Sequence, residues 1–366
     1  MELCDLAPGY VRAIAPYPPG KPISELAREM GLNPADIVKL ASNENPLGPS
    51  PLALEAIRAC LPELARYPDG NGFALKSALC AQYGVKAEQV VLGNGSNDVL
   101  EFAARAFLKP GDSAVYSQHA FAVYPLVVQA VGARGIEVPA KDFGHDPQAI
   151  LESIEDDTRL LFIANPNNPT GTLLQPQVLL GLIEQVPHNV LVLLDEAYYE
   201  YLAPQVAPQS IAWLARFPNL LIARTFSKAY GLAGLRVGFG LAHPGVVDLL
   251  NRVRQPFNVS SVAQAAALAA LGDTVHLQRS VALNTRGIQQ ICEGLKRLGL
   301  SYIPSFGNFV SFRIGGATAM YQCLLKRGII VRPVANYGMP DYLRVSIGLE
   351  TENDKFLSAL AGAMQE

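Results

Sequence analysis

Short runs of consecutive apolar residues recur between about residue 90 and residue 241. The runs are Val90–Leu92, Ala114–Tyr116, Gly135–Val138, Leu160–Ala164, Val190–Leu194, Leu220–Ala223 and Val237–Leu241. Their hydrophobicity is continuous rather than alternating, which is typical of strands that are covered on both faces. Helical stretches lie between them, so the pattern predicts an α/β fold in which a mostly parallel, seven-stranded sheet is sandwiched by helices.

The remaining periodicity predicts helices and a second unit. The predicted helices of the first unit are Asp98–Leu108, Ala120–Val131, Pro176–Gln185 and Pro244–Leu271. After Thr274 the predicted elements are an amphipathic helix near Val281–Leu298, a strand near Asn308–Arg313, a helix near Thr318–Arg327 and a last strand at Tyr342–Ile347. This change of pattern indicates a smaller α+β domain.

The N-terminal segment precedes the α/β rhythm and contains one good helix, Ser24–Met30. By elimination we expect this segment to attach to the smaller unit. The predicted division is therefore a large domain over residues 45–273, and a small domain with an N-terminal arm that combines residues 1–44 with residues 274–366. A chain of 366 residues is long enough for about two such domains.

Composition and charge narrow the classes of function. Half of the residues are hydrophobic, 17% are charged, and the net charge is −3 without a Lys/Arg cluster, so we expect a small-molecule ligand rather than nucleic acid or a membrane surface. The five cysteines form no CxxC motif and the five histidines no HxxxH or HxH group, so we expect reduced thiols and no metal site. The chain lacks a leader-like N-terminus and a bilayer-spanning stretch, which indicates a cytoplasmic protein.

Ligands of open parallel sheets bind outside the carboxyl ends of the strands, so the polar residues after the apolar runs are the candidates for chemistry. The loop from Gly93 to Asp98 is rich in small residues and opens a helix, which allows its backbone N–H groups to hold a phosphate. An ordinary glycine turn with a Ser or Asn cap is the alternative. The segment Asn165–Gly171 contains two Asn-Pro steps, which favour either a rigid loop that presents a side-chain amide or a purely structural turn.

Three further strand ends carry titratable or aromatic groups. Asp195 ends a run expected to be buried, where a carboxylate needs a partner such as a protonated ring nitrogen or an arginine, and Tyr198 adds a hydroxyl nearby. Lys228 lies in a loop of small residues before Arg236, whose positive charge would make the lysine amine a better nucleophile; a solvated lysine is the alternative. Phe121 could stack on a planar ring or belong to the core.

One ligand uses all five features. Pyridoxal phosphate needs a lysine that captures its aldehyde, an acid partner for its ring nitrogen, donors to its phenolic oxygen, an aromatic stack and a phosphate cradle. The sequence therefore predicts pyridoxal 5'-phosphate as the cofactor, held covalently by Lys228.

The segments GNGSN, NPNNPTG, DEAY and SKAYGLAGLRVG occur in the order and spacing of the fold-type I pyridoxal-phosphate aminotransferases, which this chain resembles over nearly its whole length. The resemblance implies an aspartate-aminotransferase-like fold in which Lys228 moves a proton, Asp195 pairs with the ring nitrogen, and Tyr198 with Asn168 binds the phenolic oxygen. It also implies that Phe121 stacks on the ring, where relatives often carry a tyrosine. The residues that it places at the cofactor phosphate are Gly95, Ser96, Asn97, Ser227 and Arg236.

The same resemblance implies a homodimer with two shared active sites. In such enzymes the residue that matches Tyr67 reaches the cofactor phosphate of the partner subunit. The alternative is that Tyr67 and the Pro-Asp-Gly after it form only a turn.

Three N-terminal segments, Pro16–Pro22, Leu40–Ser50 and Arg66–Gly70, are similar to the histidinol-phosphate branch of this family. The similarity implies that the substrate is recognised by Tyr17, Asn43, Arg332 and Arg344. Arg344 matches a carboxylate-binding arginine and Arg332 an arginine that assists with a phosphate, although either could form a surface salt bridge instead. The implied reaction transfers an amino group from glutamate to imidazole-acetol phosphate and gives histidinol phosphate, a step of histidine biosynthesis.

Other functions remain open on this scaffold. An aromatic amino-acid aminotransferase or a phospho-amino-acid decarboxylase would use the same cofactor site. A non-catalytic metabolite-binding protein would keep the fold alone, although every expected cofactor position is filled in this sequence.

Overall fold

Seven strands form one sheet in the order β2-β8-β7-β6-β5-β3-β4. The computed structural model describes residues 3–365 and has these strands at β2 Val90–Gly93, β3 Ser113–Ser117, β4 Arg134–Val138, β5 Thr158–Ala164, β6 Leu191–Asp195, β7 Leu220–Thr225 and β8 Gly238–Ala242. Strand β8 runs antiparallel to its neighbours β2 and β7, whereas the other neighbouring pairs are parallel. The predicted α/β fold with a mostly parallel seven-stranded sheet is confirmed, because each apolar run forms one of these strands.

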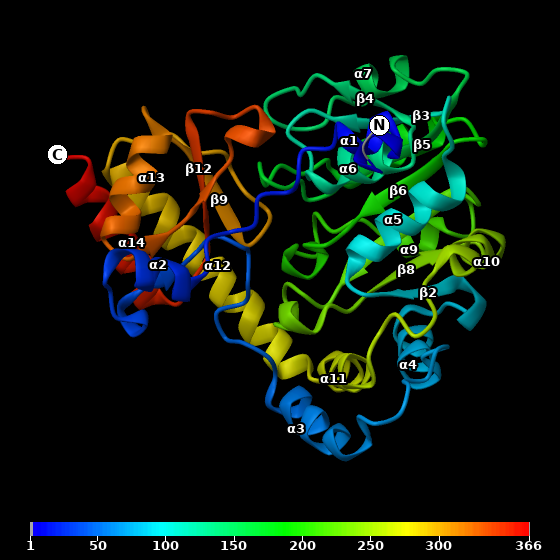
Figure 1. Ribbon diagram of the computed structural model, residues 1–366, viewed down its shortest axis with the longest axis horizontal. Helices are drawn as coiled ribbons and strands as arrows, with labels where there is room; N and C mark the ends of the chain where they lie inside the picture. The colour runs from blue at the N-terminus through cyan, green and yellow to red at the C-terminus, as the bar shows by residue number, and fades with distance from the viewer. Residues whose placement is uncertain (1–2, 366) are drawn as a thin grey trace.

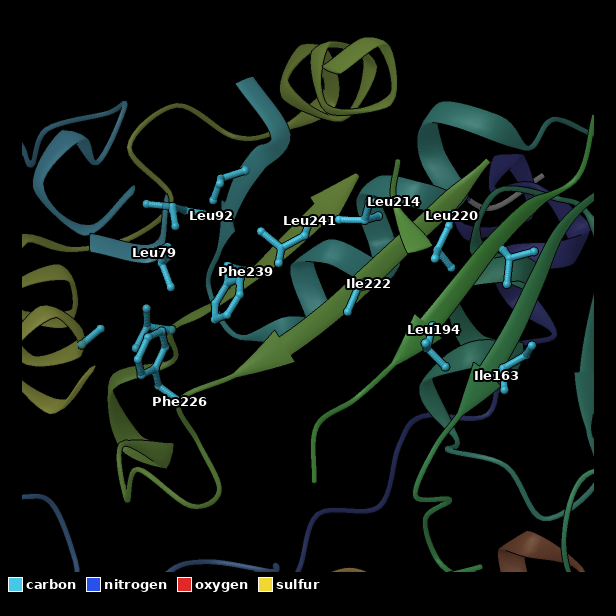
Figure 2. Packing of buried hydrophobic residues seen from close by; sticks show 14 of the residues in the cluster. Leu79, Leu92, Ile163, Leu194, Leu214, Leu220, Ile222, Phe226, Phe239 and Leu241 are labelled. Carbon is cyan, nitrogen blue, oxygen red and sulfur yellow. The ribbon is translucent and has the colours of Figure 1, made fainter. Parts of the chain in front are cut away.

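The central strands are buried on both faces, which is why their sequences are continuously apolar. Alternate side chains point to opposite faces, so Leu194 and Ile222 enter one apolar cluster while Leu193 and Leu221 enter the other. Figure 2 shows the first cluster, in which side chains from neighbouring strands meet Leu79 of helix α4. Helices α4 Phe73–Tyr83, α8 Pro176–Gln185 and α11 Ser261–Gly272 cover this face, and α5 Ser96–Phe107, α6 Val123–Ala130 and α10 Pro244–Val253 cover the other. Truncating one such leucine to alanine would cost about 2–5 kcal/mol of stability, so this packing strongly stabilises the sheet whose strands end at the site.

The single helix predicted over Pro244–Leu271 is wrong. This stretch forms two helices, α10 and α11, that are separated by residues 254–260. Pro256 lacks the N–H group that a helix needs, and Phe257 adopts a left-handed φ of 58°, so the chain leaves the helix at this point. Arg254 stabilises the connection by donating to the Asn258 side chain and to the carbonyl of Gly70, each at 2.9 Å.

A smaller unit contains the antiparallel sheet β11-β12-β9. Its elements are α12 Thr274–Arg297, β9 Phe309–Arg313, α13 Ala317–Lys326, β10 Ile329–Ile330, β11 Arg332–Pro333, β12 Tyr342–Ser346 and α14 Glu350–Ala363. Helices α12, α13 and α14 pack with the sheet into one apolar cluster that includes Phe312 and Phe356. The predicted smaller α+β unit is confirmed, and α14 is an element that the sequence pattern did not reveal.

The N-terminal segment contacts both units. Strand β1 Val38–Lys39 pairs in parallel with β10, and helix α2 Ile23–Met30 packs Leu26 against Ile330. Helix α1 Gly9–Arg12 lies instead beside α6, on the larger unit, and Figure 1 shows the chain crossing from there to α2. The domain boundaries at residues 44/45 and 273/274 stay a prediction. The remaining α-helices within residues 3–365 are α3 Pro51–Cys60, α7 Pro147–Glu152 and α9 Ser210–Trp213.

The structure also bears on membrane spans, metal sites and disulfide bonds. No helix within residues 3–365 is long and apolar enough to cross a membrane. In the same part of the chain, no three His, Cys, Asp or Glu side chains gather as the ligands of a metal ion would. All five cysteines are free.

Candidate active site

A cavity of about 210 Å³ opens at the carboxyl ends of β5, β6 and β7 and borders the N-terminus of α5 and the strands β11 and β12. Ligands of open parallel sheets bind at this edge. The cavity is lined by thirteen of the predicted site residues: Tyr17, Asn43, Ser96, Asn97, Phe121, Asn168, Asp195, Tyr198, Ser227, Lys228, Arg236, Arg332 and Arg344. Two others, Gly95 and Tyr67, are not among the lining residues.

Lys228 lies in the loop after β7, where a turn is closed by the bond from the Gly231 N–H to the Lys228 carbonyl at 3.0 Å. Its Nζ donates to the carbonyl of Ser42 at 3.2 Å. Burial, followed by the positive charges of Arg344 and Arg236, lowers the pKa of Lys228 to about 8. The amine is therefore neutral far more often than a surface lysine, as a nucleophile toward an aldehyde must be.

Asp195 is the last residue of β6. Its Oδ2 accepts from the Tyr124 hydroxyl at 2.9 Å and its Oδ1 accepts from the Ala197 N–H at 3.1 Å. Burial raises the pKa of Asp195 to about 6, although both donors and the charge of Lys228 act in the opposite direction. A buried carboxylate that is held by neutral donors favours a cationic partner, and a protonated ring nitrogen fits this requirement.

The neighbouring carboxylate, Glu196, has a different partner. Arg224 donates to Glu196 Oε2 from Nε at 2.9 Å and from Nη2 at 2.8 Å, and both side chains are buried. The guanidinium also lies over the ring of Tyr199, 3.6 Å from its centroid. Because this buried arginine pairs with Glu196, it does not serve as the ion-pair partner that was the alternative role for Asp195.

Tyr198 and Asn168 are hydrogen-bonded to residues that were predicted to bind substrate. Asn43 Nδ2 donates to the Tyr198 hydroxyl at 2.9 Å, and Arg344 donates to Asn168 Oδ1 at 2.5 Å and to the carbonyl of Ala41 at 2.7 Å. Burial raises the pKa of Tyr198 to about 12, against the opposing effects of Arg344 and of the bond from Asn43. The Tyr198 hydroxyl therefore stays protonated and can donate to an anionic oxygen.

The loop that carries Asn168 is tied back on itself. Asn165 Oδ1 accepts from the Leu174 N–H at 2.8 Å and Asn165 Nδ2 donates to the Leu174 carbonyl at 3.1 Å. The Asn165-Pro166 and Asn168-Pro169 peptide bonds are both cis. The two hydrogen bonds between Asn165 and Leu174 support the predicted fixed loop, which presents the Asn168 amide to the cavity.

The N-terminus of α5 and Arg236 form a cradle for an anion. Ser96 begins the helix, and Arg236 Nη1 donates to Ser227 Oγ at 3.3 Å. A Cβ atom at Gly95 would lie 2.5 Å from Arg236 Nη2, so the glycine allows the guanidinium to approach the helix end. Backbone N–H groups at a helix N-terminus, a hydroxyl and a guanidinium are the groups that bind phosphate. Gly95 thus supports the cavity without lining it.

Arg332 and Arg344 are buried, with exposed fractions of 7% and 5%, so neither is the surface ion pair that was the alternative for them. They are opposite each other in the pairing of β11 with β12. The N-terminal arm covers Arg332, because Arg332 Nη2 donates to the Pro18 carbonyl at 2.8 Å and its guanidinium lies 5.3 Å from the centroid of the Tyr17 ring.

The two aromatic predictions have different outcomes. Phe121 lines the cavity and meets the ring of Tyr124 edge-on, with 5.8 Å between the centroids. Tyr67 lies away from the cavity with 83% of its surface exposed, and its ring stacks on Phe257 at 4.8 Å. A role for Tyr67 in an active site therefore requires a second subunit.

Some residues of the cavity were not foreseen. Tyr124, the partner of Asp195, lies in the first turn of α6, three residues after Phe121. In the helix predicted over Ala120–Val131 this spacing puts both residues on one face, so it was an available signal. Tyr337 lines the cavity from a connection without any motif. The carbonyls of Ala41 and Ser42 accept bonds from Arg344 and Lys228, and backbone acceptors leave no signature in a sequence.

Comparisons with known proteins identify the family of this chain. A model of the family aminotransferase class I and II matches residues 35–360. The chain is 66% identical over 359 residues to the histidinol-phosphate aminotransferase of Methylobacillus flagellatus, which covers 98% of this chain and 97% of the relative. It is 62% identical over 366 residues to histidinol-phosphate aminotransferase 2 of Nitrosospira multiformis, with coverage of 100% and 93%.

A solved structure extends the comparison to the fold. The crystal structure of histidinol-phosphate aminotransferase from Sinorhizobium meliloti, in complex with pyridoxal-5'-phosphate, matches with a TM-score of 0.90 at 29% identity and covers 98% of this chain and 97% of that one. The expected fold-type I architecture is thereby confirmed. With a family match that spans most of the sequence, the chain belongs to the aminotransferase class I and II family.

Proposed function

We propose that this chain is a pyridoxal-phosphate-dependent aminotransferase that uses glutamate and imidazole-acetol phosphate to form histidinol phosphate in histidine biosynthesis. The observation that carries the proposal is one cavity that holds Lys228 and Asp195 together with the paired arginines Arg332 and Arg344. Relatives of 62% and 66% identity whose names state this activity support the choice of substrate.

The residues around the cavity fit the cofactor. When bound, pyridoxal phosphate supplies an aldehyde that bonds to amines and a protonated ring that withdraws electrons from the bond being broken. Lys228 would hold the aldehyde through its amine and would move the proton at the reacting carbon of the substrate, and a pKa near 8 suits this role. Asp195 would hold the ring nitrogen in its protonated form.

The remaining cofactor contacts fix orientation. Tyr198 and Asn168 would donate to the phenolic oxygen, and Phe121 would stack on the ring. The phosphate is held by the cradle of Ser96, Asn97, Ser227 and Arg236, which Gly95 makes possible.

The two substrates differ in the anion that they present to the arginines. Glutamate has an α-carboxylate, which fits the fork of Arg344. Histidinol phosphate has no such carboxylate and carries a phosphate ester instead, which fits between Arg344 and Arg332, beside Tyr17. Within residues 3–365 the Nε of Arg344 is buried without a hydrogen-bond partner, so this guanidinium has an unsatisfied donor. Asn43 contributes through Tyr198, to which it is hydrogen-bonded.

A panel of amino donors with 2-oxoglutarate tests the substrate. We expect histidinol phosphate to have the highest kcat/KM, and a clear preference for phenylalanine or tyrosine would refute the assignment. Borohydride treatment of the holoenzyme tests the cofactor site independently. After reduction, the cofactor should be found bound to the peptide that contains Lys228. Cofactor bound to another lysine would contradict the assigned role.

We also propose that the enzyme is a homodimer with shared active sites. Large apolar side chains are exposed along the segment from α3 to the start of α4, where Leu61, Leu64, Tyr67 and Phe73 have exposed fractions of 52%, 54%, 83% and 77%. A run of exposed apolar residues of this size favours a protein interface. Tyr67 would reach the cofactor phosphate of the partner subunit from this surface. The free cysteines support the further proposal that the protein works in the reducing cytoplasm.

A further inference from the structure

Tyr337 lines the cavity, although neither its sequence context nor the proposed mechanism gives it a role. It lies in the short 3-10 helix η7 (Ala335–Tyr337), within the connection from β11 to β12. These two strands carry Arg332 and Arg344 at opposed positions, so the connection is tied to both arginines. Only 6% of the Tyr337 surface is exposed.

The backbone of Tyr337 is held from the side of the seven-stranded sheet. His119 Nδ1 donates to the carbonyl of Tyr337, and Asn167 Nδ2 donates to the carbonyl of His119 at 3.0 Å. Gly338 follows with a φ of 73°, and a Cβ there would lie 3.4 Å from the His119 ring. Because these contacts use the backbone, a change of the Tyr337 side chain leaves them in place.

The phenol of Tyr337 lies among the groups expected to bind the substrate anion. Burial raises the pKa of Tyr337; Arg344 lowers it, Tyr17 raises it and Arg332 lowers it. The hydroxyl therefore stays protonated and neutral, and Tyr337 lines the same cavity as Arg332 and Arg344.

The substrate anions differ in the number of oxygen atoms that can accept a hydrogen bond from the Tyr337 hydroxyl. A carboxylate offers two oxygens, and one arginine fork can engage both of them. A phosphate monoester offers three terminal oxygens. A phosphate between Arg332 and Arg344 therefore has an acceptor that a third donor can use, and Tyr337 lines the same cavity as both arginines.

We propose that Tyr337 is a specificity-determining residue that donates its hydroxyl to the phosphate of histidinol phosphate and contributes little to the binding of glutamate. This inference rests on the proposed function, because it requires a phosphate ester between the two arginines. It adds a third donor that distinguishes a phosphate from a carboxylate.

The Tyr337→Phe holoenzyme tests the inference. We expect its KM for histidinol phosphate to rise about tenfold, as for a lost hydrogen bond to a charged group, while kcat and the KM for glutamate stay within about twofold. Tyr342→Phe is the matched control, since Tyr342 packs in the same apolar cluster as Tyr337 but does not line the cavity. An equal rise of KM for both substrates, or no rise for histidinol phosphate, would overturn the inference.

Inhibition by inorganic phosphate separates this inference from the proposed function. Phosphate should compete with glutamate in the wild-type holoenzyme, and its inhibition constant should rise about tenfold in Tyr337→Phe. If the wild type did not use histidinol phosphate and this rise still occurred, the substrate assignment would fail and with it the specificity role, although Tyr337 would remain a donor to a bound phosphate. If the wild type used histidinol phosphate but phosphate inhibition were the same in both proteins, only the inference would fail.

Discussion

Arg332 and Arg344 are direct cross-strand partners in the buried antiparallel pair of β11 and β12. Like charges on directly opposed positions repel each other, and burial adds a desolvation cost. Burial accordingly lowers the pKa of Arg344, against the opposing effects of Tyr198 and Tyr337. An anion that binds between the two arginines would relieve both costs, so the pair is suited to a doubly charged group.

The arginine pair leads to a first prediction, which concerns specificity. Lysine keeps the charge but loses the fork, so Arg344→Lys should raise the KM for both glutamate and histidinol phosphate by about 10- to 100-fold. Arg332→Lys should raise the KM for histidinol phosphate by about tenfold and affect glutamate less. Steady-state kinetics with each substrate would measure both effects. A loss confined to glutamate in Arg344→Lys would contradict the shared role of that arginine.

The second prediction concerns the stability of the cofactor-free protein. The pKa of Lys228 is lowered from 10.5 to about 8 in the folded protein, so between these values the unfolded chain binds more protons and stability rises with pH. Below pH 8 the folded protein holds a buried cation at a cost. Lys228→Met should therefore stabilise the cofactor-free protein at pH 7 by up to roughly 3 kcal/mol. The gain should disappear as the pH approaches 10.5.

Denaturant unfolding of cofactor-free protein at pH 7 and at pH 10 would measure this effect. Lys296→Met on the exposed side of α12 is the control, and it should change stability little at either pH. A destabilised Lys228→Met protein at pH 7 would show that the ammonium group is well solvated in the folded state.

The sequence predicted the seven-stranded sheet because burial on both faces leaves a continuous apolar run at each strand. The same reasoning failed at Pro244–Leu271, where apolar residues continue through a break that Pro256 and the left-handed Phe257 impose. Apolar content reports burial, whereas the direction of the chain depends on individual backbone angles. The helix α14 was missed although it buries Phe356 and Leu360.

Most of the site could be predicted because its side chains follow strand ends in a parallel sheet, which fold to a common edge. Asp195 and Lys228 are examples, since Asp195 is the last residue of a buried strand and Lys228 follows the next one. Tyr337 could not be found in this way, because it comes from a connection whose position depends on a bond to His119 in the other unit. The role of Tyr67 depends on a second chain, and contacts between subunits cannot be predicted from the residue pattern of one sequence.

The third prediction concerns Tyr124, whose hydroxyl bonds to Asp195 and lowers the pKa of that carboxyl group. Tyr124→Phe should raise the pKa of Asp195, so the ionised form that holds the ring nitrogen is lost as the pH falls. We expect the affinity for pyridoxal phosphate to drop about tenfold at pH 6 and less than threefold at pH 8. Tyr116→Phe, in the same apolar cluster but outside the cavity, should show neither drop. Equal losses at the two pH values would argue against the pKa effect.

The fourth prediction uses mixed dimers to test the shared active sites. Tyr67→Ala should lower activity because each site lacks the tyrosine of its partner, and Lys228→Ala should abolish activity because each site lacks its lysine. In a heterodimer of the two variants, the site with an intact Lys228 receives an intact Tyr67. Half of the dimers in an equal mixture are heterodimers with one native site of two, so activity should recover to about a quarter of the wild-type value.

The exposed apolar segment supplies the control for this experiment. Leu64 lies in it with 54% of its surface exposed, and a dimer that buried an unpaired aspartate there would be destabilised strongly, with dissociation roughly 100-fold more favourable. When both variants also carry Leu64→Asp, light scattering should show monomers and mixing should restore no activity. Leu249→Asp, an exposed position on α10, should leave complementation intact. Recovery of activity without dimers would show that Tyr67 acts within its own chain.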